Sequence, residues 1–560
     1  MAKLCLVLVA ALAACGPSKV SHDGGNGGDD DAGSGSSQPQ PHTLVGLSIT
    51  PVNPLVELDL NATAAQDFMV TGMYADDTQE DLTAQVSWTV ANPAVGAFTI
   101  SQLAIPAFTT AQAITSKLTA SYNGVDGLAQ ITVVAHRPQD FFFILPYNDP
   151  GGPANQPLTF ATAIPQLDVF FLMDVTGSMS GEISNLQSSL NSTVLPGIQN
   201  AVANSQFGVG AFADFPISPF GQAGDQPFSL RQAITATTAA VMSGVTSLSG
   251  AGYGGGYDGP EAALEAIYQV ATGEGLTGPA PTSVAANHNG VGGVAFRADA
   301  MPVIVDITDA PSHAVGETGN CGGDLGYTGT VATYAHSRAQ TKTALAGICG
   351  RVVGISSGAG ACTGVEYMTD LATTTGARVP PQAWDVGTRP AGCGATQCCT
   401  GLNGVGVVAD AQGLCPLVFA ASTNGTGVGA GVTTGIQMLT RFATFDVTRE
   451  TSGVTTDIDG NPLPAGHTTA DFLKTIAPAS FVVPPPPPVL PNPTFDATTF
   501  HGVTPGTQVG FTVDAFNDFV VQTDQAQIFH ATIQVLAGGC TPLDQRDVLI
   551  LVPPQPIVIN

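Results

Sequence analysis

Hydrophobic and polar positions alternate in the first quarter of the chain with the two-residue period of β-strands. The alternation covers residues 47–51, 66–74, 86–90 and 130–134, and segments rich in turn-forming residues separate them. This pattern predicts a β-sandwich over residues 44–135.

The pattern changes at residue 166, where apolar strands begin to alternate with helical segments. Residues 167–173 are almost continuously apolar, as expected for a strand covered on both faces. The next helix is predicted from an apolar face formed by Ile183, Leu186, Leu190, Val194, Ile198 and Val202. Further strands are predicted at 207–215, 301–307, 351–355 and 417–421, and further helices at 262–271, 330–347, 365–375 and 428–442. This alternation indicates an α/β doubly wound domain with a parallel sheet over residues 166–442.

Strand patterns return after residue 442 and predict a C-terminal β-sandwich over 443–560. A proline run at 484–488 predicts an extended polyproline spacer or edge within it. Residues 136–165 contain two strand-like segments, which are too few to fold alone. We expect them to join the C-terminal sandwich, with the α/β domain inserted between the two parts. Simple tandem domains are the alternative arrangement.

The N-terminus has the pattern of an export signal. Lys3 precedes an apolar run at 4–14 that is too short to span a membrane, and small residues precede Cys15. Leu12-Ala13-Ala14-Cys15 resembles the lipobox of bacterial lipoproteins, in which the cysteine becomes the acylated first residue. Residues 16–43 are rich in Gly, Ser and Asp and predict a flexible linker. We therefore expect residues 1–15 to be a lipoprotein signal peptide. The lipidated Cys15 would then hold the exported chain in the cell envelope, at the outer membrane or cell surface.

The charge of the chain limits its partners. The 560 residues carry a formal charge of −28 with only 15 Lys and Arg, so the surface repels phosphate backbones and we expect no nucleic-acid partner. An acidic surface is compatible with cation binding.

Cysteines are expected to form disulfides, because an exported protein folds in an oxidising compartment. Without Cys5 and Cys15, eight of the ten cysteines remain. They are Cys321, Cys349, Cys362, Cys393, Cys398, Cys399, Cys415 and Cys540. Zinc at Cys393 to Cys415 is the alternative, although the spacing matches no zinc template.

Candidate metal chemistry begins directly after the first buried strand of the α/β domain. Asp174, Thr176 and Ser178 alternate with other residues in a loop before a helix, at the sheet edge where open α/β folds bind ligands. Mg²⁺ prefers such oxygen ligands, although a helix N-cap explains the two hydroxyl residues equally well. Two more acidic segments, 256–261 and 306–313, lie at predicted strand ends or loops that can face the same crevice.

These motifs together resemble the von Willebrand factor A domain, and within that superfamily the A-like domain of integrin β subunits. The resemblance rests on Asp174-x-Thr176-x-Ser178, residues 207–214 with 216–220, Asp258-Gly259-Pro260-Glu261 and residues 308–313. It implies a Mg²⁺ or Mn²⁺ adhesion site whose ligands are Asp174, Thr176, Ser178, Glu261 and Asp309.

The same resemblance implies two further positions that this chain matches incompletely. A Ca²⁺ site beside the first would use Asp214, Asp258, the carbonyl of Pro260 and the shared Glu261, but its asparagine aligns near Gly256. A third site needs two adjacent acids, and this chain has Gly181 and Glu182 there. We expect His313 to be a hydrogen-bond partner near the site and not a catalytic base.

A second resemblance concerns the N-terminal segment. Residues 67–74, 81–83, 86–88 and 92–95 are similar to the bacterial Ig-like family, with Trp88 expected in the core. This family pattern is structural and implies a spacer or adhesive module.

The function predicted from these patterns is binding and not catalysis. We expect an envelope-anchored adhesion or protein-binding module whose metal ion takes a carboxylate from its partner. One alternative is a serine hydrolase using Ser356 in Gly354-Ile355-Ser356-Ser357-Gly358, with His467 or His501 as base, although no helix follows this motif directly. The other is a structural envelope protein with a vestigial metal site.

Overall fold

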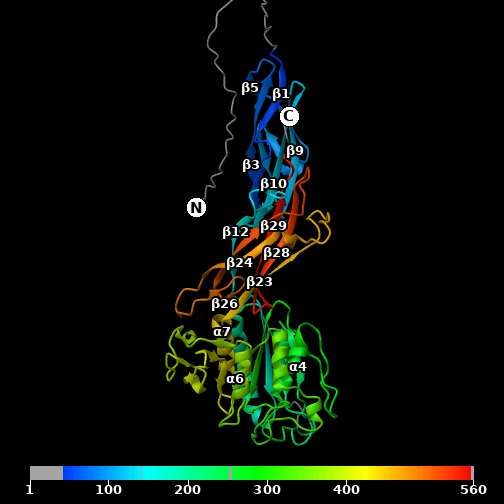
Figure 1. Ribbon diagram of the computed structural model, residues 1–560. Helices are drawn as coiled ribbons and strands as arrows, with labels where there is room; N and C mark the ends of the chain where they lie inside the picture. Colours follow the sequence, from blue (N-terminus) through cyan, green and yellow to red (C-terminus); the bar gives the residue numbers. More distant parts are fainter. Residues whose placement is uncertain (1–41, 139, 251–254, 557–560) are drawn as a thin grey trace, which may run out of the picture.

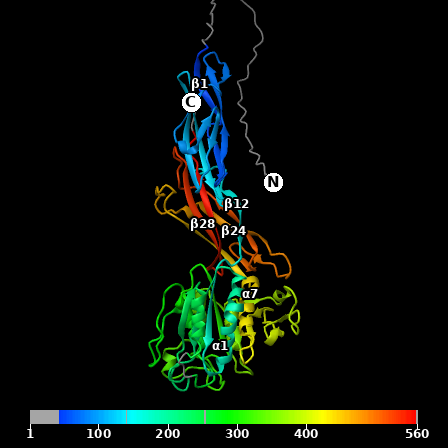
Figure 2. The same ribbon diagram turned by 180° about the vertical axis from the view of Figure 1, so that it is seen from behind.

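The chain folds into three units that follow one another along a long axis (Figures 1 and 2). The computed structural model describes residues 42–138, 140–250 and 255–556. The predicted signal peptide, Cys15 and nearly all of the linker lie outside the described residues. The units are a first β unit (42–136), a second β unit (141–161 with 445–552) and an α/β unit (167–442) at one end.

The first β unit has its own hydrophobic core. Its sheets have the strand orders β1-β4-β5, β2-β10-β9-β6 and β3-β8-β7. The strands are β1 (Leu44–Thr50), β2 (Leu55–Asp59), β3 (Ala64–Asp67), β4 (Met69–Tyr74), β5 (Gln79–Asp81), β6 (Ser87–Val90), β7 (Ala97–Thr99), β8 (Gln102–Ile105), β9 (Gln112–Tyr122) and β10 (Val125–His136). Trp88 lies at the margin of this core, half-buried and stacked on Phe98 with 4.1 Å between ring centroids.

The second β unit is made from both sides of the α/β unit. Strands β11 (Phe141–Ile144) and β12 (Ala154–Ala161) pair with β29 (Thr541–Val552) and β27 (Gln508–Ala515). The sheet orders are β11-β29-β28-β23-β26-β25 and β12-β27-β24. The remaining strands are β23 (Phe445–Gly453), β24 (Leu473–Val482), β25 (Thr494–Phe495), β26 (Phe500–Val503) and β28 (Gln527–Ala537). The α/β unit therefore lies, in sequence, between two segments that share the same sheets.

The α/β unit is built on a six-stranded sheet of order β15-β14-β13-β16-β17-β22. Its strands are β13 (Leu167–Asp174), β14 (Ser205–Phe212), β15 (Ser229–Thr235), β16 (Met301–Thr308), β17 (Arg351–Ser356) and β22 (Val418–Ala420). All pair in parallel except β15, which is antiparallel at one edge. Every residue of β13 and β16 is buried, which explains why both strands are mostly apolar; their acids Asp168, Asp174 and Asp306 are buried with them.

Helices cover both faces of this sheet (Figures 1 and 2). One face carries α1 (Ser180–Ser189), α2 (Leu195–Gln199), α3 (Thr238–Thr246) and α7 (Val428–Phe442), and the other α4 (Ala263–Thr272), α5 (Arg338–Gly347) and α6 (Val365–Thr374). The predicted apolar face from Ile183 to Val202 is buried, although a wider turn at Leu190–Val194 separates α1 from α2. Helix α5 begins later than expected, because Ser337 and Gln340 form a capping box at its start. Short two-residue strands β18 to β21 lie in the segment 378–416.

Both chain crossings between the α/β unit and the second β unit lie at one end of the sheet. The chain leaves β12 at Ala161 and enters β13 at Leu167, and it leaves α7 at Phe442 to enter β23 at Phe445. One hydrophobic core cluster runs through both units. Since β13 starts at this junction, its carboxyl end at Asp174 lies at the opposite, distal end of the molecule.

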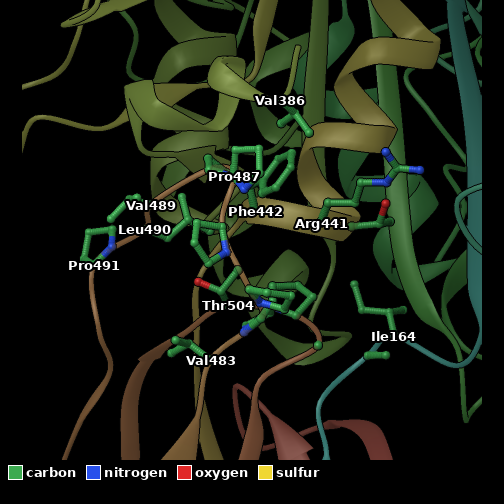
Figure 3. A pocket seen from close by; sticks show the side chains of 18 of the residues that line it. Ile164, Val386, Arg441, Phe442, Val483, Pro487, Val489, Leu490, Pro491 and Thr504 are labelled. Carbon is green, nitrogen blue, oxygen red and sulfur yellow. The ribbon is translucent and has the colours of Figure 1, made fainter.

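An apolar cavity of about 450 Å³ lies at this junction (Figure 3). Its walls include Ile164, Val386, Phe442 and the proline-rich segment 483–491. The proline run was expected to be extended, but the chain bends at 486–488 and wraps around the cavity. Because the cavity lies at the junction and Asp174 lies at the distal end of β13, the cavity is remote from Asp174.

All eight described cysteines form disulfides, which confirms the prediction of pairing. The pairs are Cys321–Cys362, Cys349–Cys540, Cys393–Cys399 and Cys398–Cys415. The zinc alternative is wrong for this structure, because the four sulfurs between Cys393 and Cys415 bond to each other. Cys349–Cys540 connects the α/β unit to the second β unit across 191 residues of sequence.

Candidate metal centre

Asp174 anchors the candidate site at the carboxyl end of β13. Its side chain is fully buried, and its Oδ1 accepts hydrogen bonds from the Thr176 backbone N–H at 2.9 Å and the Thr176 hydroxyl at 2.7 Å. Its Oδ2 accepts a 2.6 Å hydrogen bond from the hydroxyl of Thr308, at the end of β16. The loop and the neighbouring strand thereby fix the orientation of this carboxylate.

Ser178 and Asp309 form the open side of the site. The Ser178 hydroxyl donates to Asp309 Oδ1 at 3.2 Å, joining the loop after β13 to the residue after β16. Ser178 is exposed and Asp309 is half-buried, whereas Asp174 and Thr176 are buried. Solvent or a partner can therefore approach from the Ser178 and Asp309 side.

Glu261 is positioned by backbone pairing with the loop after β16. Its N–H donates to Pro311 O at 2.9 Å, and its carbonyl accepts the N–H of His313 at 2.8 Å. A Cβ placed on Gly256 would lie 2.6 Å from Glu261 Oε1 and 3.4 Å from Thr176 Cγ2, so all three meet in one place. Gly256 has a φ of +82°, and the absence of a side chain allows this close approach.

The buried carboxylates in this region raise one another's pKa values. Burial raises the pKa of Glu261 to about 12, and the charges of Asp174, Asp214, Asp225 and Asp258 add to this effect. Burial also raises the pKa of Asp174 to about 7, against the opposing hydrogen bonds from Thr308 and Thr176. Either protons or a cation must neutralise such a cluster.

The donor set fits a hard divalent cation. Glu261 Oε2 is buried and has no hydrogen-bond partner among the described residues, so one carboxylate oxygen is left to meet an ion. In the described part of the chain no three His, Cys, Asp or Glu residues gather as a metal-binding group. An ion here would therefore take at most two of the acids Asp174, Glu261 and Asp309 directly and would also need the hydroxyl oxygens of Thr176 and Ser178, which suits Mg²⁺ or Mn²⁺.

The second, Ca²⁺-type position does not fit an ion. Asp214 Oδ2 lies 2.7 Å from His313 Nδ1, and its Oδ1 accepts the Tyr327 hydroxyl at 2.8 Å. His313 Nε2 lies 3.5 Å from Asp258 Oδ2, an ion-pair distance. The imidazole therefore stands between the two acids that the resemblance assigned to Ca²⁺, and neither Pro260 nor Glu261 completes a set of ligands around that position.

The third position does not fit an ion either. A Cβ on Gly181 would lie 2.6 Å from the backbone of Asn424, so the loop after β22 occupies the space an acidic side chain would need. Glu182 alone points inward, where burial and the charge of Asp309 raise its pKa.

Sequence reasoning missed three contributors to the site. Thr308 was not proposed as a partner of Asp174, and Asp225 was not singled out at all. Asp225 accepts the N–H groups of Gly255 and Gly256 at 3.2 and 3.3 Å and thereby shapes the turn beside Glu261. The third is the Cys321–Cys362 loop, because the carbonyl of Cys321 packs directly against Gly259. Only Thr308 had a sequence signal, as a hydroxyl residue ending an apolar strand.

Ser356, the residue of the hydrolase alternative, has no base beside it. Its hydroxyl is buried and has no hydrogen-bond partner within the described residues. His467 pairs with Asp471, and His501 pairs with Asp446 and Asp496, all in the second β unit. Gly358 instead packs against the backbone of Asp309, which accounts for the glycine in this motif.

A family comparison agrees with this arrangement of sheet, loop and acids. Residues 161–279, which include the Asp174 loop and Glu261, match the integrin β chain von Willebrand factor A domain. The chain contains a von Willebrand factor A domain. The matched segment extends from β12 through α4 of the A domain, and its resemblance to the integrin β type is thereby confirmed.

Other similarities are more limited. A stretch of 62 residues is 44% identical to Ice-binding protein 1 of Shewanella frigidimarina (strain NCIMB 400), covering 11% of this chain and 6% of that protein. The von Willebrand factor type A protein from Catenulispora acidiphila aligns over 73% of this chain and 71% of its own, with 11% identity and a TM-score of 0.28. The pilus adhesin SpaC from Lactobacillus rhamnosus GG aligns over 83% and 55%, with 13% identity and a TM-score of 0.26. At these TM-scores the structural likenesses carry no argument about function.

One further observation concerns the membrane. Across residues 42–138, 140–250 and 255–556, none of the helices is both long and apolar enough to cross a bilayer.

Proposed function

We propose that this protein is an adhesion or protein-binding module in which a divalent cation at the Asp174 loop binds a carboxylate of the partner. The observation that carries the proposal is the Glu261 carboxylate. It is buried beside Asp174, leaves Oε2 without a hydrogen bond, and faces further acids nearby. A cation would coordinate this oxygen and would also offset the negative charge of the surrounding carboxylates.

The open side of the site supports a ligand that completes the coordination of the ion. Asp174 and Glu261 are buried, while Ser178 is exposed and Asp309 is half-buried. An ion held there partly by neutral hydroxyls can keep an exchangeable water on the open side of the site. A partner carboxylate can replace that water, whereas without the ion the chain's charge of −28 would repel it.

The proposed location is the bacterial cell envelope, with Cys15 as a lipid anchor and residues 16–43 as the tether. The lipobox-like sequence and the composition of the linker support this part of the proposal. The distal position of Asp174 agrees with it, because the binding site then points away from the junction with the β units (Figure 1).

Calorimetric titration of the full chain with Mg²⁺ tests the metal step. We expect one binding event that Asp174→Ala abolishes, because the variant loses a charged ligand and keeps only weak hydroxyl donors. Asp457→Ala is the matched control, since this acid only closes a turn in the second β unit by accepting N–H groups of Asp459 and Asn461. Wild-type protein that takes up no Mg²⁺ or Mn²⁺ at millimolar concentration would refute the proposal.

A peptide library tests the carboxylate step. Peptides selected on the wild-type chain in Mg²⁺ should contain an essential Asp or Glu and should be released by EDTA. Replacing that acid by its amide should remove binding. Selection of peptides that ignore both EDTA and the amide replacement would contradict a metal-bridged carboxylate.

A further inference from the structure

His313 lies between two acids of the second cluster, Asp214 and Asp258, beside the backbone of Glu261. The side chain is fully buried, and its two nitrogens face Asp214 at 2.7 Å and Asp258 at 3.5 Å. An imidazole with a carboxylate at each nitrogen is best satisfied when both nitrogens carry protons. The ring then supplies one positive charge to these two acids.

Aromatic rings hold the imidazole in place. The Tyr327 ring stacks on it with centroids 4.8 Å apart, and the edge of Phe220 meets it at 5.1 Å. Tyr327 also donates its hydroxyl to Asp214 at 2.8 Å, so the same residue holds both partners of the ion pair. The space between Asp214 and Asp258 is therefore filled by a ring in a rigid aromatic cage.

Backbone contacts fix the ring relative to the first site. The N–H of His313 donates to the Glu261 carbonyl, and Ser312 pairs with Glu261 as a parallel bridge. Asp258 in turn packs its carboxylate against the backbone of Gly323, where a side chain would collide with it. The histidine and both acids are thus held by the segments that hold Glu261.

We propose that the His313 imidazolium replaces the second metal ion of this A domain, so that no divalent cation binds between Asp214 and Asp258. A protein-supplied cation cannot be removed by a chelator or lost at low Ca²⁺ concentration. One positive charge therefore stays between Asp214 and Asp258 at any metal concentration, and only the ion at the Asp174 loop responds to that concentration. This inference goes beyond the proposed function, because it concerns a position that the Asp174 ion does not occupy.

Ca²⁺ binding in an Asp174→Ala background tests the proposal without the first site. In this background we expect no bound Ca²⁺ by equilibrium dialysis with His313 present. Adding His313→Ala should create a site for one Ca²⁺ per chain, because Asp214 and Asp258 then lose their cation and the cavity left by the ring can hold an ion. The melting temperature of that double variant should rise by roughly 5–10 °C at a hundredfold excess of Ca²⁺ over its Kd.

His336→Ala in the same background is the matched control. His336 Nδ1 pairs with buried Glu265 at 3.0 Å, and its ring stacks on Tyr268, but it faces one carboxylate and not two. Its removal should lower stability in EDTA and Ca²⁺ alike and create no Ca²⁺ site. This separates a gained ion site from a general loss of packing.

His313→Gln is a second variant that keeps more of the ring's volume while removing its charge. It should also gain Ca²⁺-dependent stability. The proposal is overturned if Asp174→Ala alone binds one Ca²⁺, or if neither His313 variant gains an ion. It is equally overturned if both variants fail to fold in millimolar Ca²⁺, because the ion should replace the lost charge. Loss of Mg²⁺ binding in the wild type would refute the proposed function and leave these outcomes unaffected.

Discussion

Glu261→Gln should change the stability of the A domain in opposite directions with and without metal. In EDTA the wild-type Glu261 must fold in its protonated form, because burial and the surrounding acids raise its pKa from 4.5 to about 12. Glutamine has nearly the same shape and no charge to neutralise. The variant should therefore be more stable than the wild type without metal and less stable than the wild type in saturating Mg²⁺.

The size of the effect at neutral pH follows from proton linkage. Each pH unit above the unfolded pKa of 4.5 costs the folded protein about 1.4 kcal/mol, so at pH 7 the cost is about 3 kcal/mol. The folded state binds one proton more than the unfolded state in this range, so wild-type stability should fall as pH rises from 5 to 8. The variant should lack this contribution. In Mg²⁺ at a thousandfold excess over Kd, the wild type should instead gain about 4.1 kcal/mol, which exceeds this cost.

The two tryptophans allow the A domain to be followed by itself. Trp88 lies in the first β unit and Trp384 is buried in the A domain, so a Trp88→Phe background leaves a single reporter. Urea unfolding of the wild type and of Glu261→Gln, followed by Trp384 fluorescence in EDTA and in Mg²⁺, gives the four free energies of unfolding that are compared. Repeating the measurement at several pH values gives their pH dependence.

Glu265→Gln provides the control on the neighbouring helix. Glu265 is also buried, but it accepts hydrogen bonds from the N–H and the ring of His336, so its replacement should destabilise the domain under both conditions. Equal pH dependence of wild type and Glu261→Gln in EDTA, or a variant no more stable than wild type there, would refute the reasoning.

Three further predictions concern the rest of the chain. Arg297→Leu should lower the free energy of unfolding of the A domain by about 3–5 kcal/mol, because it leaves the fully buried Asp168 without the guanidinium that pairs with it at 2.7 Å. The double variant Arg297→Leu, Asp168→Asn should recover part of this loss of stability in the Trp384 assay. The double variant Cys349→Ser, Cys540→Ser should lower the free energy of unfolding by about 2–4 kcal/mol, since this disulfide closes a loop of 191 residues. Removing Cys393–Cys399, whose separation is 6, should cost less in the same Trp384 assay. Cys15→Ser should move the protein out of the membrane fraction, and mass spectrometry of the wild type should find an acylated Cys15.

The sequence predicted the α/β unit well because its signals are local. Buried strands such as β13 and β16 are mostly apolar runs, and the face from Ile183 to Val202 keeps a helical period. Element ends were less accurate, because they depend on particular side chains such as the capping box of Ser337 and Gln340. The bend at 486–488 was missed for a different reason: it follows the cavity wall formed by distant residues.

The residues of the candidate site could be proposed from the sequence, whereas their hydrogen-bond partners could not. The loop of Asp174, Thr176 and Ser178 is contiguous in sequence, and Asp309 follows an apolar strand. The contacts of His313 with Asp214 and Asp258 join three loops, so no spacing in the sequence indicates them. Disulfide pairing is equally nonlocal, and an even number of cysteines predicts only that pairs exist.

The placement of both crossings at one end of the sheet has a mechanical consequence. A partner held at Asp174 and an anchor beyond the β units would pull on β13 along its own length. Neighbouring strands β14 and β16 pair in parallel with β13 along its length, so displacing β13 under this tension would require both ladders to shear at once and not to peel open bond by bond. Cys349–Cys540 adds a covalent connection across the same junction, parallel to the two chain crossings. If a partner and an anchor pulled on the two ends of the molecule, the A domain would therefore resist the force along the length of its central strand.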